Sequence, residues 1–437
     1  MGYKKIEMKV FTLICFITIT FFGSTQVVRI PIGKTSSGSG ELKLTLVNRY
    51  QHYNGNPKSK ADSFDEAINS PKSVNYSLDG KKFYVQSLEG YTTAVYDAAT
   101  KKRIKTIKHV FDAKNQSLFK NGETTAFDYK FSKTKENYNY FSGKPVESCF
   151  SHGGKYLWVT YYRRDYDSNA ECPSAVAIID TEKDEIVRVM PTGPLPKMIA
   201  CSPDNKYIAV THWGDNTLGI INIESENPMD FFYHKHCVVD YQMELNFGGK
   251  HVDRDSECGY CLRGTVFSPD GQFLLVGKMG GAGGVAVFDA NSYQLIGTVK
   301  GMQSNVRHLV INADNLFLSA NSPGYVQKCN WRDFVKSRVE NEEKEIQFTN
   351  FESVFVGSGA RTIVTTSDGK YLFAAVNNGS KIVAVRSADM KIVAEIPADS
   401  YPVGMDISPD DKELIVTAQG KNDSGGNSVM VFKITFD

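Results

Sequence analysis

The chain repeats one pattern of apolar and polar residues seven times. In each copy a short apolar strand leads into a turn similar to Ser-Pro-Asp-Gly, and a strand of alternating aromatic and aliphatic residues follows. Proline fixes φ, and Asp, Asn and Gly accept turn geometry, so each copy predicts a hairpin. The turn serines or their equivalents are Ser77, Ser151, Ser202, Ser268, Asn312, Thr366 and Ser408.

A third strand and often a fourth follow each hairpin, for example residues 285–289 and 294–299. The closest turn residues, such as Thr366 and Ser408, lie 42 positions apart. Four antiparallel strands in about 40 to 50 residues are typical of one propeller blade. The sequence therefore predicts an all-β fold, a seven-bladed β-propeller of four-stranded antiparallel blades.

The last blade has only three strands before the chain ends at Asp437. An isolated strand over residues 42–48, near the N-terminus, can supply the fourth. Such pairing would join the two ends of the chain and remove the open edges of the ring. We therefore expect the N-terminal strand to close the last blade.

Residues 1–25 have the pattern of a signal peptide. Lys4, Lys5 and Lys9 precede an apolar run over residues 10–22, and small residues follow. This run is shorter than the roughly 20 residues that a membrane-spanning helix needs. We expect a secreted, periplasmic or cell-surface protein with no transmembrane segment in the mature chain.

The expected organisation is a signal peptide at 1–25, a linker at 26–40 and a single propeller at 41–437. Three insertions are expected in the propeller, at 109–144, 224–260 and 330–357, with a short helix near 331–345.

Residues 377–386, 391–396 and 401–410 resemble the YVTN family of bacterial propeller repeats, which is related to lactonase-like and YncE-like propellers. Residues 211–223 resemble it as well. The resemblance covers about residues 70–437 and implies the propeller fold. Because that family includes surface-layer proteins, stress proteins and enzymes, it implies no single activity.

The charges almost cancel, with 50 Lys and Arg against 49 Asp and Glu. This balance disfavours a general nucleic-acid binder. Basic residues nevertheless recur at one position, five residues before the turn residue, where five of seven are Lys or Arg. This position begins the innermost strand of each blade, so its side chains should converge on the central funnel. The series is Lys72, Val146, Lys197, Arg263, Arg307, Arg361 and Val403.

Neighbouring loops add further candidates for the same funnel: Tyr161, Tyr162, Arg163, Arg164, His212, Trp213, Lys278 and His308. A ring of like charge focuses a positive potential even on a nearly neutral protein. The sequence thus predicts a binding site for an anionic small molecule, a glycan or a protein partner, with aromatic rings as a stacking surface. The alternative is that the basic residues form ion pairs with Glu147, Asp215 and Asp406.

Two other functions remain open. The phrase around Arg307 and His308 resembles the Pro-Arg-His phrase of lactonase propellers, which implies a hydrolase with His308 as general base and Arg307 stabilising an oxyanion. A propeller acting as a rigid spacer in a surface layer is the structural alternative. The related haem-binding propellers would use His212, His308 and the arginines.

The candidate metal ligands are few, and we expect no resident cofactor. Cys237, Cys258 and Cys261 lie near His234, His236 and His251 and could bind zinc, although a disulfide or free thiols fit the spacing better. Asp165, Asp167 and Asn169 alternate as calcium ligands do, but Ala170 stands where a calcium loop has glycine.

Overall fold

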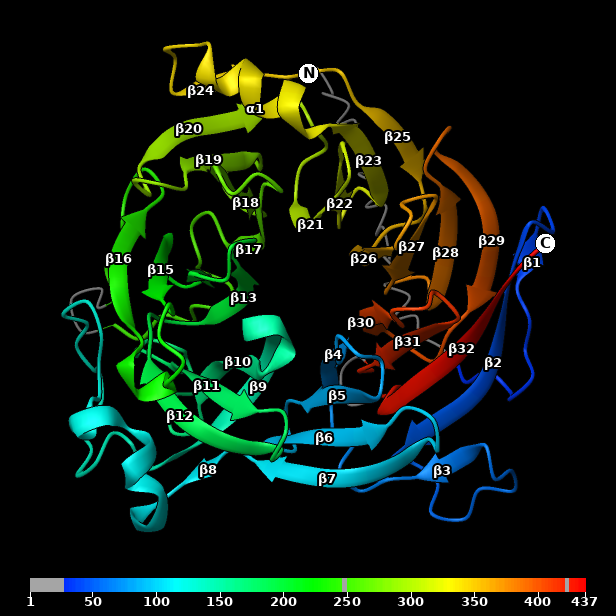
Figure 1. The fold of residues 1–437 in the computed structure, drawn as a ribbon, viewed down its shortest axis with the longest axis horizontal. Helices are drawn as coiled ribbons and strands as arrows, with labels where there is room; N and C mark the ends of the chain where they lie inside the picture. The colour runs from blue at the N-terminus through cyan, green and yellow to red at the C-terminus, as the bar shows by residue number, and fades with distance from the viewer. Residues whose placement is uncertain (1–26, 246–249, 421–423) are drawn as a thin grey trace, which may run out of the picture.

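The computed structural model describes residues 27–245, 250–420 and 424–437, and these form seven small sheets arranged in a ring (Figure 1). The predicted seven-bladed β-propeller is confirmed. The innermost strand of every blade faces the central axis, and the outer strands form the rim (Figure 1). The signal peptide that we predicted at residues 1–25 lies outside the described residues.

The first four blades follow chain order. Blade one contains β4 (Pro71–Tyr76), β5 (Lys82–Ser87), β6 (Thr92–Asp97) and β7 (Lys102–Lys108). Blade two contains β9 (Phe141–Ser151), β10 (Tyr156–Arg164), β11 (Ala175–Asp180) and β12 (Glu185–Pro191), with β8 (Val110–Phe111) beside β9. Blade three contains β13 (Pro196–Cys201), β14 (Tyr207–His212), β15 (Thr217–Asn222) and β16 (Phe232–Val238). Blade four contains β17 (Leu262–Phe267), β18 (Phe273–Lys278), β19 (Val285–Asp289), β20 (Leu295–Lys300) and β24 (Glu345–Gln347).

Blade five follows chain order, whereas blades six and seven also include strands from the N-terminal part of the chain. Blade five contains β21 (Val306–Asn312), β22 (Asn315–Ala320), β23 (Tyr325–Asn330) and β25 (Glu352–Phe355). Blade six contains β26 (Ala360–Thr365), β27 (Tyr371–Val376), β28 (Lys381–Arg386), β29 (Lys391–Pro397) and β1 (Ser37–Gly38). Blade seven contains β30 (Pro402–Ile407), β31 (Glu413–Ala418), β32 (Ser428–Phe436), β2 (Leu42–Gln51) and β3 (Asp62–Phe64).

The repeated turns hold the hairpins as the sequence predicts. In blade three the Ser202 hydroxyl donates to Asp204 Oδ1 at 2.6 Å and accepts the backbone N–H of Tyr207 at 2.9 Å. The hydroxyls at Ser77, Ser268, Thr366 and Ser408 make the same pair of contacts. Each turn thus satisfies its own polar groups, which leaves the flanking strands free to pair.

The core consists of apolar layers between neighbouring blades. One layer packs Phe373 and Ile382 of blade six against Leu414 and Phe432 of blade seven. Another packs Ile415 and Val431 of blade seven against Phe83 of blade one. Each blade therefore needs both neighbours in order to bury its two faces.

The ring is closed by β2, as predicted. It pairs antiparallel with β32 from Leu42 opposite Phe436 to Gln51 opposite Ser428. Leu44 and Leu46 on β2 are fully buried in the layer between blades six and seven. Figure 1 shows β2 and β32 side by side although they come from opposite ends of the chain.

A buried ionic cluster supports this closure. The Arg49 guanidinium lies 3.3 Å from Asp399, forms an ion pair with Asp62 and donates to the carbonyl of Ile30 at 2.7 Å. Asp399 also accepts the Ile30 N–H at 2.9 Å and the Ser428 hydroxyl at 2.7 Å. The cluster joins three parts of the chain that lie far apart in the sequence.

The stretch 26–40 that we predicted as a linker is, from residue 27 onward, attached to the outside of blades six and seven. Ser37 and Gly38 pair with β29, and Val28 donates its N–H to the Ser400 hydroxyl at 2.7 Å. A Gly- and Ser-rich composition predicts a linker, but it also lets a backbone approach a sheet edge closely: a Cβ on Gly38 would lie 1.9 Å from the carbonyl oxygen of Val393.

The segments predicted as insertions need new boundaries. Segment 224–260 includes β16, the outer strand of blade three, and 330–357 includes β25, the outer strand of blade five. Outer strands are half exposed, so they lack the apolar alternation that identifies inner strands. Segment 109–144 holds β8 and two 3₁₀ turns, at Ala113–Leu118 and Lys120–Gly122. The short helix is α1 (Trp331–Val339), which begins after the capping side chain of Asn330.

Of the helices in the described part of the chain, none is sufficiently long and apolar to span a bilayer.

A test of ring closure compares two positions on β2. Leu44→Ala removes a buried side chain from the layer between blades six and seven, so we expect the free energy of unfolding to fall by about 2–5 kcal/mol. Lys43→Ala, on the exposed face of the same strand, should change it by less than about 0.5 kcal/mol. Denaturant unfolding followed by tryptophan fluorescence measures both. Equal effects of the two substitutions would contradict a stabilising role of β2 in closing the ring.

Candidate functional site: the funnel pocket

A backbone irregularity recurs where each inner strand enters the funnel. In all seven blades the register between the inner strand and its neighbour shifts at the position that the repeat pattern singled out. In six blades the residue two positions earlier has positive φ: Ser70, Leu195, Cys261, Asn305, Gly359 and Tyr401. A β-bulge re-aims its side chain out of the pleat. The side chain five residues before the turn residue, which we call the funnel position, is therefore directed toward the channel.

Hydroxyl groups of the second strand satisfy the backbone at some of these bulges. The Thr211 hydroxyl accepts the N–H of Met198 and donates to its carbonyl, both at 3.2 Å. Thr160 does the same for Glu147, and Thr417 for Gly404. The backbone N–H and C=O groups that leave the strand pairing at these bulges are thus paired with threonine hydroxyls.

The funnel positions converge on one pocket of about 380 Å³. All five basic residues of the series line it, together with Tyr162 and Arg163 at the end of β10 and Trp213, which follows β14. The other lining residues are Leu88, Glu89, Val146, Asp255 and Gln419. We refer to this cavity as the funnel pocket.

On one side of the funnel pocket Lys197 is enclosed by its own partners. Its ammonium lies 3.0 Å from Asp255 Oδ1, 4.1 Å from the centre of the Tyr162 ring and 4.9 Å from that of Trp213. The Tyr162 hydroxyl donates to Asp255, and the Trp213 indole N–H donates to the Asp255 carbonyl at 3.2 Å. One face of each ring is therefore already used by a cation of the protein itself.

Arg263 has a partner from another blade. Its guanidinium forms an ion pair with Glu147, which is on β9 of blade two, whereas Arg263 is on β17 of blade four. This ion pair was part of the alternative that we considered from the sequence. The other two proposed carboxylates lie elsewhere: Asp215 accepts from Tyr129 and Thr217, and Asp406 accepts the N–H of Tyr76.

Lys72, Arg307 and Arg361 have no carboxylate within ion-pair distance among the described residues. Lys72 donates to the amide oxygen of Gln419 at 2.6 Å, and Arg307 donates to the sulfur of Met279 at 3.4 Å. The Nε of Arg307 is buried and has no hydrogen-bond partner in the described part of the chain. These three side chains come from blades one, five and six, so they occupy the side of the pocket opposite to Lys197.

Burial and mutual repulsion lower the proton affinity of this cluster. Burial lowers the pKa of Lys197 to about 7, with Arg263 and Arg307 adding to the effect and Asp255 opposing it. Burial and then repulsion from Arg361 lower the pKa of both Lys72 and Arg307 well below their usual values. Burial opposes ionisation of Asp255, but the Lys197 ammonium, the Tyr162 hydroxyl and Lys72 together lower the pKa of Asp255 to about 2. Asp255 is thus an anion at neutral pH.

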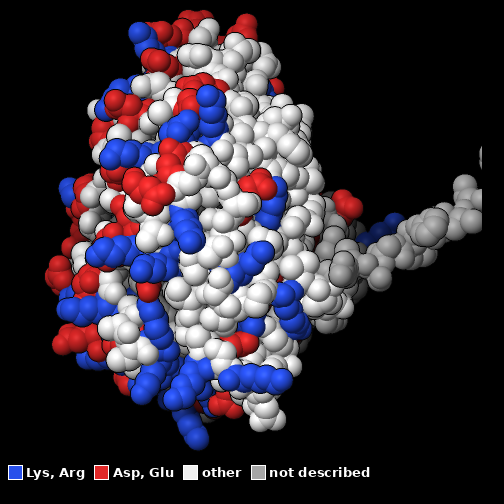
Figure 2. Space-filling view, turned by 90° about the vertical axis from the view of Figure 1, so that its right-hand side faces the viewer, with Lys and Arg blue, Asp and Glu red and all other residues white. Residues whose placement is uncertain are grey.

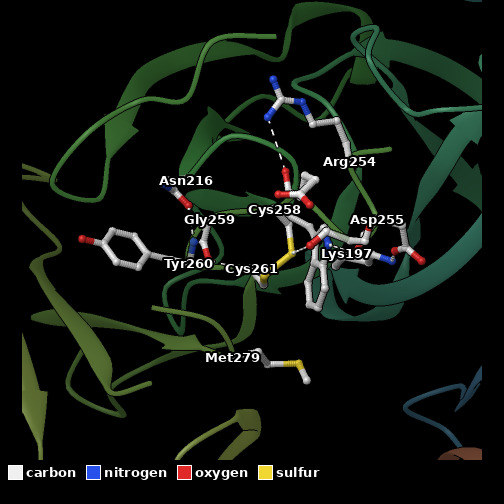
Figure 3. Close-up of a disulfide and its surroundings, with 12 residues drawn as sticks. Lys197, Asn216, Arg254, Asp255, Cys258, Gly259, Tyr260, Cys261 and Met279 are labelled. Carbon is white, nitrogen blue, oxygen red and sulfur yellow. Dashed lines mark hydrogen bonds and ion pairs between the residues drawn. A yellow bond between two sulfur atoms is a disulfide. The ribbon is translucent and has the colours of Figure 1, made fainter. Parts of the chain in front are cut away.

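Asp255 belongs to a loop that a disulfide anchors beside the pocket. Cys258 and Cys261 are bonded, and the Tyr260 N–H between them donates to Asn216 Oδ1 at 2.7 Å. In Figure 3 Asp255 and Lys197 lie on one side of the disulfide and Tyr260 points away on the other. The loop thus places the Asp255 carboxylate at the edge of a pocket whose other residues come from the blades.

The structure does not assemble the candidate zinc ligands. Cys258 and Cys261 are bonded to each other, whereas the Cys237 thiol donates to the carbonyl of Tyr293 at 3.4 Å. Within the described residues no group of three His, Cys, Asp or Glu is gathered as metal ligands. In the candidate calcium loop Asp167 instead accepts the N–H groups of Glu171 and Cys172.

Five residues that we expected in the funnel have other positions, all of them in contact with protein groups: Tyr161, Arg164, His212, Lys278 and His308. The Arg164 guanidinium donates to the carbonyls of Tyr138, Thr124 and Ser174. The Tyr161 hydroxyl contacts His109 Nδ1 at 2.9 Å. These two side chains fix segment 109–144 against blade two.

The remaining three of those residues also have structural contacts. Buried His212 bonds the hydroxyls of Thr192 and Thr217 at 2.8 and 2.7 Å. Lys278 lies 3.7 Å above the Tyr260 ring and 3.5 Å from Asp240. His308 Nδ1 accepts the N–H of Ile363 from blade six at 3.4 Å, and burial lowers the pKa of His308 to about 4.

Asp255 and Gln419 are pocket residues that sequence reasoning missed. Asp255 sits in a segment that matches no repeat, and Gln419 immediately follows β31. A signal for Gln419 was available, because residues just after the second strand of each blade should lie on the funnel face. Nothing in the local sequence showed that Asp255 reaches Lys197.

The outer surface has a different character from the funnel pocket. On the side of the ring drawn in Figure 2, acidic and basic side chains are interspersed and gather toward one face.

Comparisons with known proteins identify the fold. No protein-family model matches the sequence, and no curated protein matches it. The structure is similar to Kuenenia stuttgartiensis hydrazine synthase, with a TM-score of 0.59, 14% identity, and 87% of this chain and 100% of that chain covered. It is also similar to the β-propeller domain of Cps50 (Swd1) from Myceliophteria thermophila, with a TM-score of 0.56, 12% identity, and coverages of 84% and 97%. At such low identity these similarities establish the propeller fold alone.

The position of Arg164 can be tested against its neighbour in the sequence. Arg164→Met should lower the free energy of unfolding by about 2–4 kcal/mol, because buried carbonyls lose their charged donor. Arg163→Met, at a partly exposed position, should change it by less than about 1 kcal/mol. Limited proteolysis within segment 109–144 should accelerate only in the first variant. Similar proteolysis of both variants would contradict this structural role.

Proposed function

We propose that this protein is an exported β-propeller of the YVTN type that binds an anionic ligand in the funnel pocket. The ligand is a small molecule, a glycan or an anionic group of a partner protein. The observation that supports this proposal best is the convergence of Lys72, Arg307 and Arg361 in one cavity with no carboxylate partner among the described residues.

The physical argument rests on the energy of the free pocket. A buried guanidinium loses its hydration, and it recovers that energy only through charge-assisted hydrogen bonds. When all are charged, the five basic residues of the series outnumber their paired carboxylates, Asp255 and Glu147, by three. A bound anion would offset the repulsion, and the rigid inner strands already hold the donors in place.

Export is supported by the signal-peptide pattern at residues 1–25, with the periplasm, the cell surface or the medium as the destination. The disulfide between Cys258 and Cys261 agrees with an oxidising compartment.

Binding without chemistry is favoured over hydrolysis. Arg307 lines the funnel pocket, but His308 is not among its lining residues and already accepts a hydrogen bond from Ile363. Asp255 lies in the pocket, yet its pKa of about 2 makes it a weak general base at neutral pH.

A thermal-shift screen tests the proposal. Phosphate, sulfate, citrate, malonate and acetate are compared with sodium chloride of equal ionic strength. A ligand at 100 times its Kd adds about 2.7 kcal/mol of stability and raises Tm. Arg307→Gln should abolish the rise, whereas Lys206→Gln, at an exposed ion pair with Glu224, should retain it. The proposal fails if no anion raises Tm above the chloride control.

The pKa of Lys197 gives a second prediction. An anion prefers the protonated ammonium, so binding of sulfate should weaken between pH 6.5 and 8.5, by up to about tenfold per pH unit for each linked proton. Lys197 faces Asp255, Tyr162, Arg263 and Arg307, and the first two do not titrate in this window. Isothermal titration calorimetry measures the affinity, and Lys197→Arg should flatten the profile. An affinity that rises with pH would contradict the assignment.

A further inference from the structure

The funnel pocket is divided into two halves with different electrostatic states. In the half made by blades two, three and four, Lys197 and Arg263 are neutralised by Asp255 and Glu147. In the half made by blades five, six and one, Arg307, Arg361 and Lys72 have no carboxylate partner in the described part of the chain. The basic residues without an ion-pair partner are therefore those of the second half, where the one lining carboxylate, Glu89, is paired with Lys144.

We propose that the ligand carries one compact dianionic head group, which binds to Arg307, Arg361 and Lys72, and that the part of the ligand facing Asp255 is uncharged. This inference rests on the proposed function and names the class of ligand. A phosphate monoester of a neutral body has this chemistry, and so does a short dicarboxylate.

The charge of the head group follows from the number of unmatched cations. A monoanion would neutralise one of the three and leave two positive groups side by side in a half-buried part of the pocket. A dianion leaves one, and the fork-shaped guanidinium groups of Arg307 and Arg361 suit two oxygens each. The lowered pKa of Lys72 agrees with a group that becomes fully protonated when the anion arrives.

The compactness of the head group follows from the distribution of the pocket carboxylates. Glu89, the pocket-lining carboxylate of blade one, forms an ion pair with Lys144. Glu147 reaches across the channel to Arg263, and Asp255 lines the pocket on the side of Lys197. A second anionic group placed on that side would face these carboxylates at short range, and like charges close together are repelled. The volume of about 380 Å³ also limits the ligand to a small molecule or to the tip of a larger one.

Asp255 acts as a specificity-determining residue in this arrangement. It holds Lys197 at 3.0 Å, so it already occupies the place that a second anionic group of a ligand would take. Its loop is anchored by the Cys258–Cys261 disulfide and by Asn216, which limits its movement away from the pocket.

The decisive experiment compares methyl phosphate with dimethyl phosphate at pH 7.5 by calorimetry on the unmodified protein. The two have the same tetrahedral centre but carry about two charges and one charge. We expect methyl phosphate to bind at least about tenfold more tightly. Malonate and acetate form a second pair, and binding by malonate in place of methyl phosphate would identify a dicarboxylate head group. Equal affinities within both pairs would overturn the inference.

Two variants locate the head group. Arg361→Gln removes an unmatched cation and should weaken binding of methyl phosphate at least about tenfold. The double variant Arg263→Gln/Glu147→Gln removes a matched pair from the other half without changing the net charge, so it should weaken binding clearly less than Arg361→Gln does. A loss in the double variant as large as that in Arg361→Gln would overturn the division into halves.

These outcomes are separable from those of the proposed function. If no anion binds, the proposed function fails. If monoanions bind as tightly as dianions, anion binding stands and only the dianionic class is lost. Asp255→Asn provides an independent check, because it frees Lys197 and should allow citrate, which bears several separated carboxylates, to bind more tightly than it does to the unmodified protein. Unchanged or weaker citrate binding would contradict the role of Asp255.

Discussion

The pairing of β2 with β32 is the constraint on which the rest of the molecule depends. Each blade buries its two faces only against its neighbours, so a ring with one open junction would expose two apolar faces at once. Closure also fixes the seven inner strands around one axis. Equivalent positions of the repeat then meet in space, although up to about 330 residues separate them in the chain. The buried cluster of Arg49, Asp62 and Asp399 keeps both ends of the chain at this junction.

Convergence has an electrostatic cost that the protein offsets only in part. A Lys or Arg on a single strand would be solvated, but five of them at the same position of the repeat are brought together in a partly dry pocket. Glu147 and Asp255 compensate two, while burial and then mutual repulsion lower the pKa of Lys72 and Arg307. A fold selected for stability alone would place apolar residues there, as blades two and seven do with Val146 and Val403. Basic residues that recur at one position of the repeat without a full set of carboxylate partners agree with a binding site at this position.

The fold could be predicted in detail because its determinants are local and repeated. The hydroxyl of Ser202 and its equivalents closes the same turn in blade after blade, and alternation marks the inner strands. The basic series was predictable for the same reason, since one bulge aims each member at the channel. The orientation of side chains on β10 could not be predicted from the sequence. Two register shifts there change which of Tyr161, Tyr162, Arg163 and Arg164 faces inward. Outer strands such as β16 and β25 were missed since half-exposed strands show no clear apolar pattern.

The residue that makes the funnel pocket asymmetric comes from outside the repeat. A ring of similar blades supplies charge nearly evenly around its axis, so it can attract an anion but has little means to orient one. The loop of blade three breaks this symmetry by placing Asp255 on Lys197, with the disulfide and Asn216 fixing the loop from behind. The residues that attract an anion thus lie in the repeats, whereas the residue that selects among anions lies in the loop. Because Asp255 itself is not part of the apolar layers between blades, this position can change without cost to the ring, and ligand preference can change while the fold and the basic series stay the same.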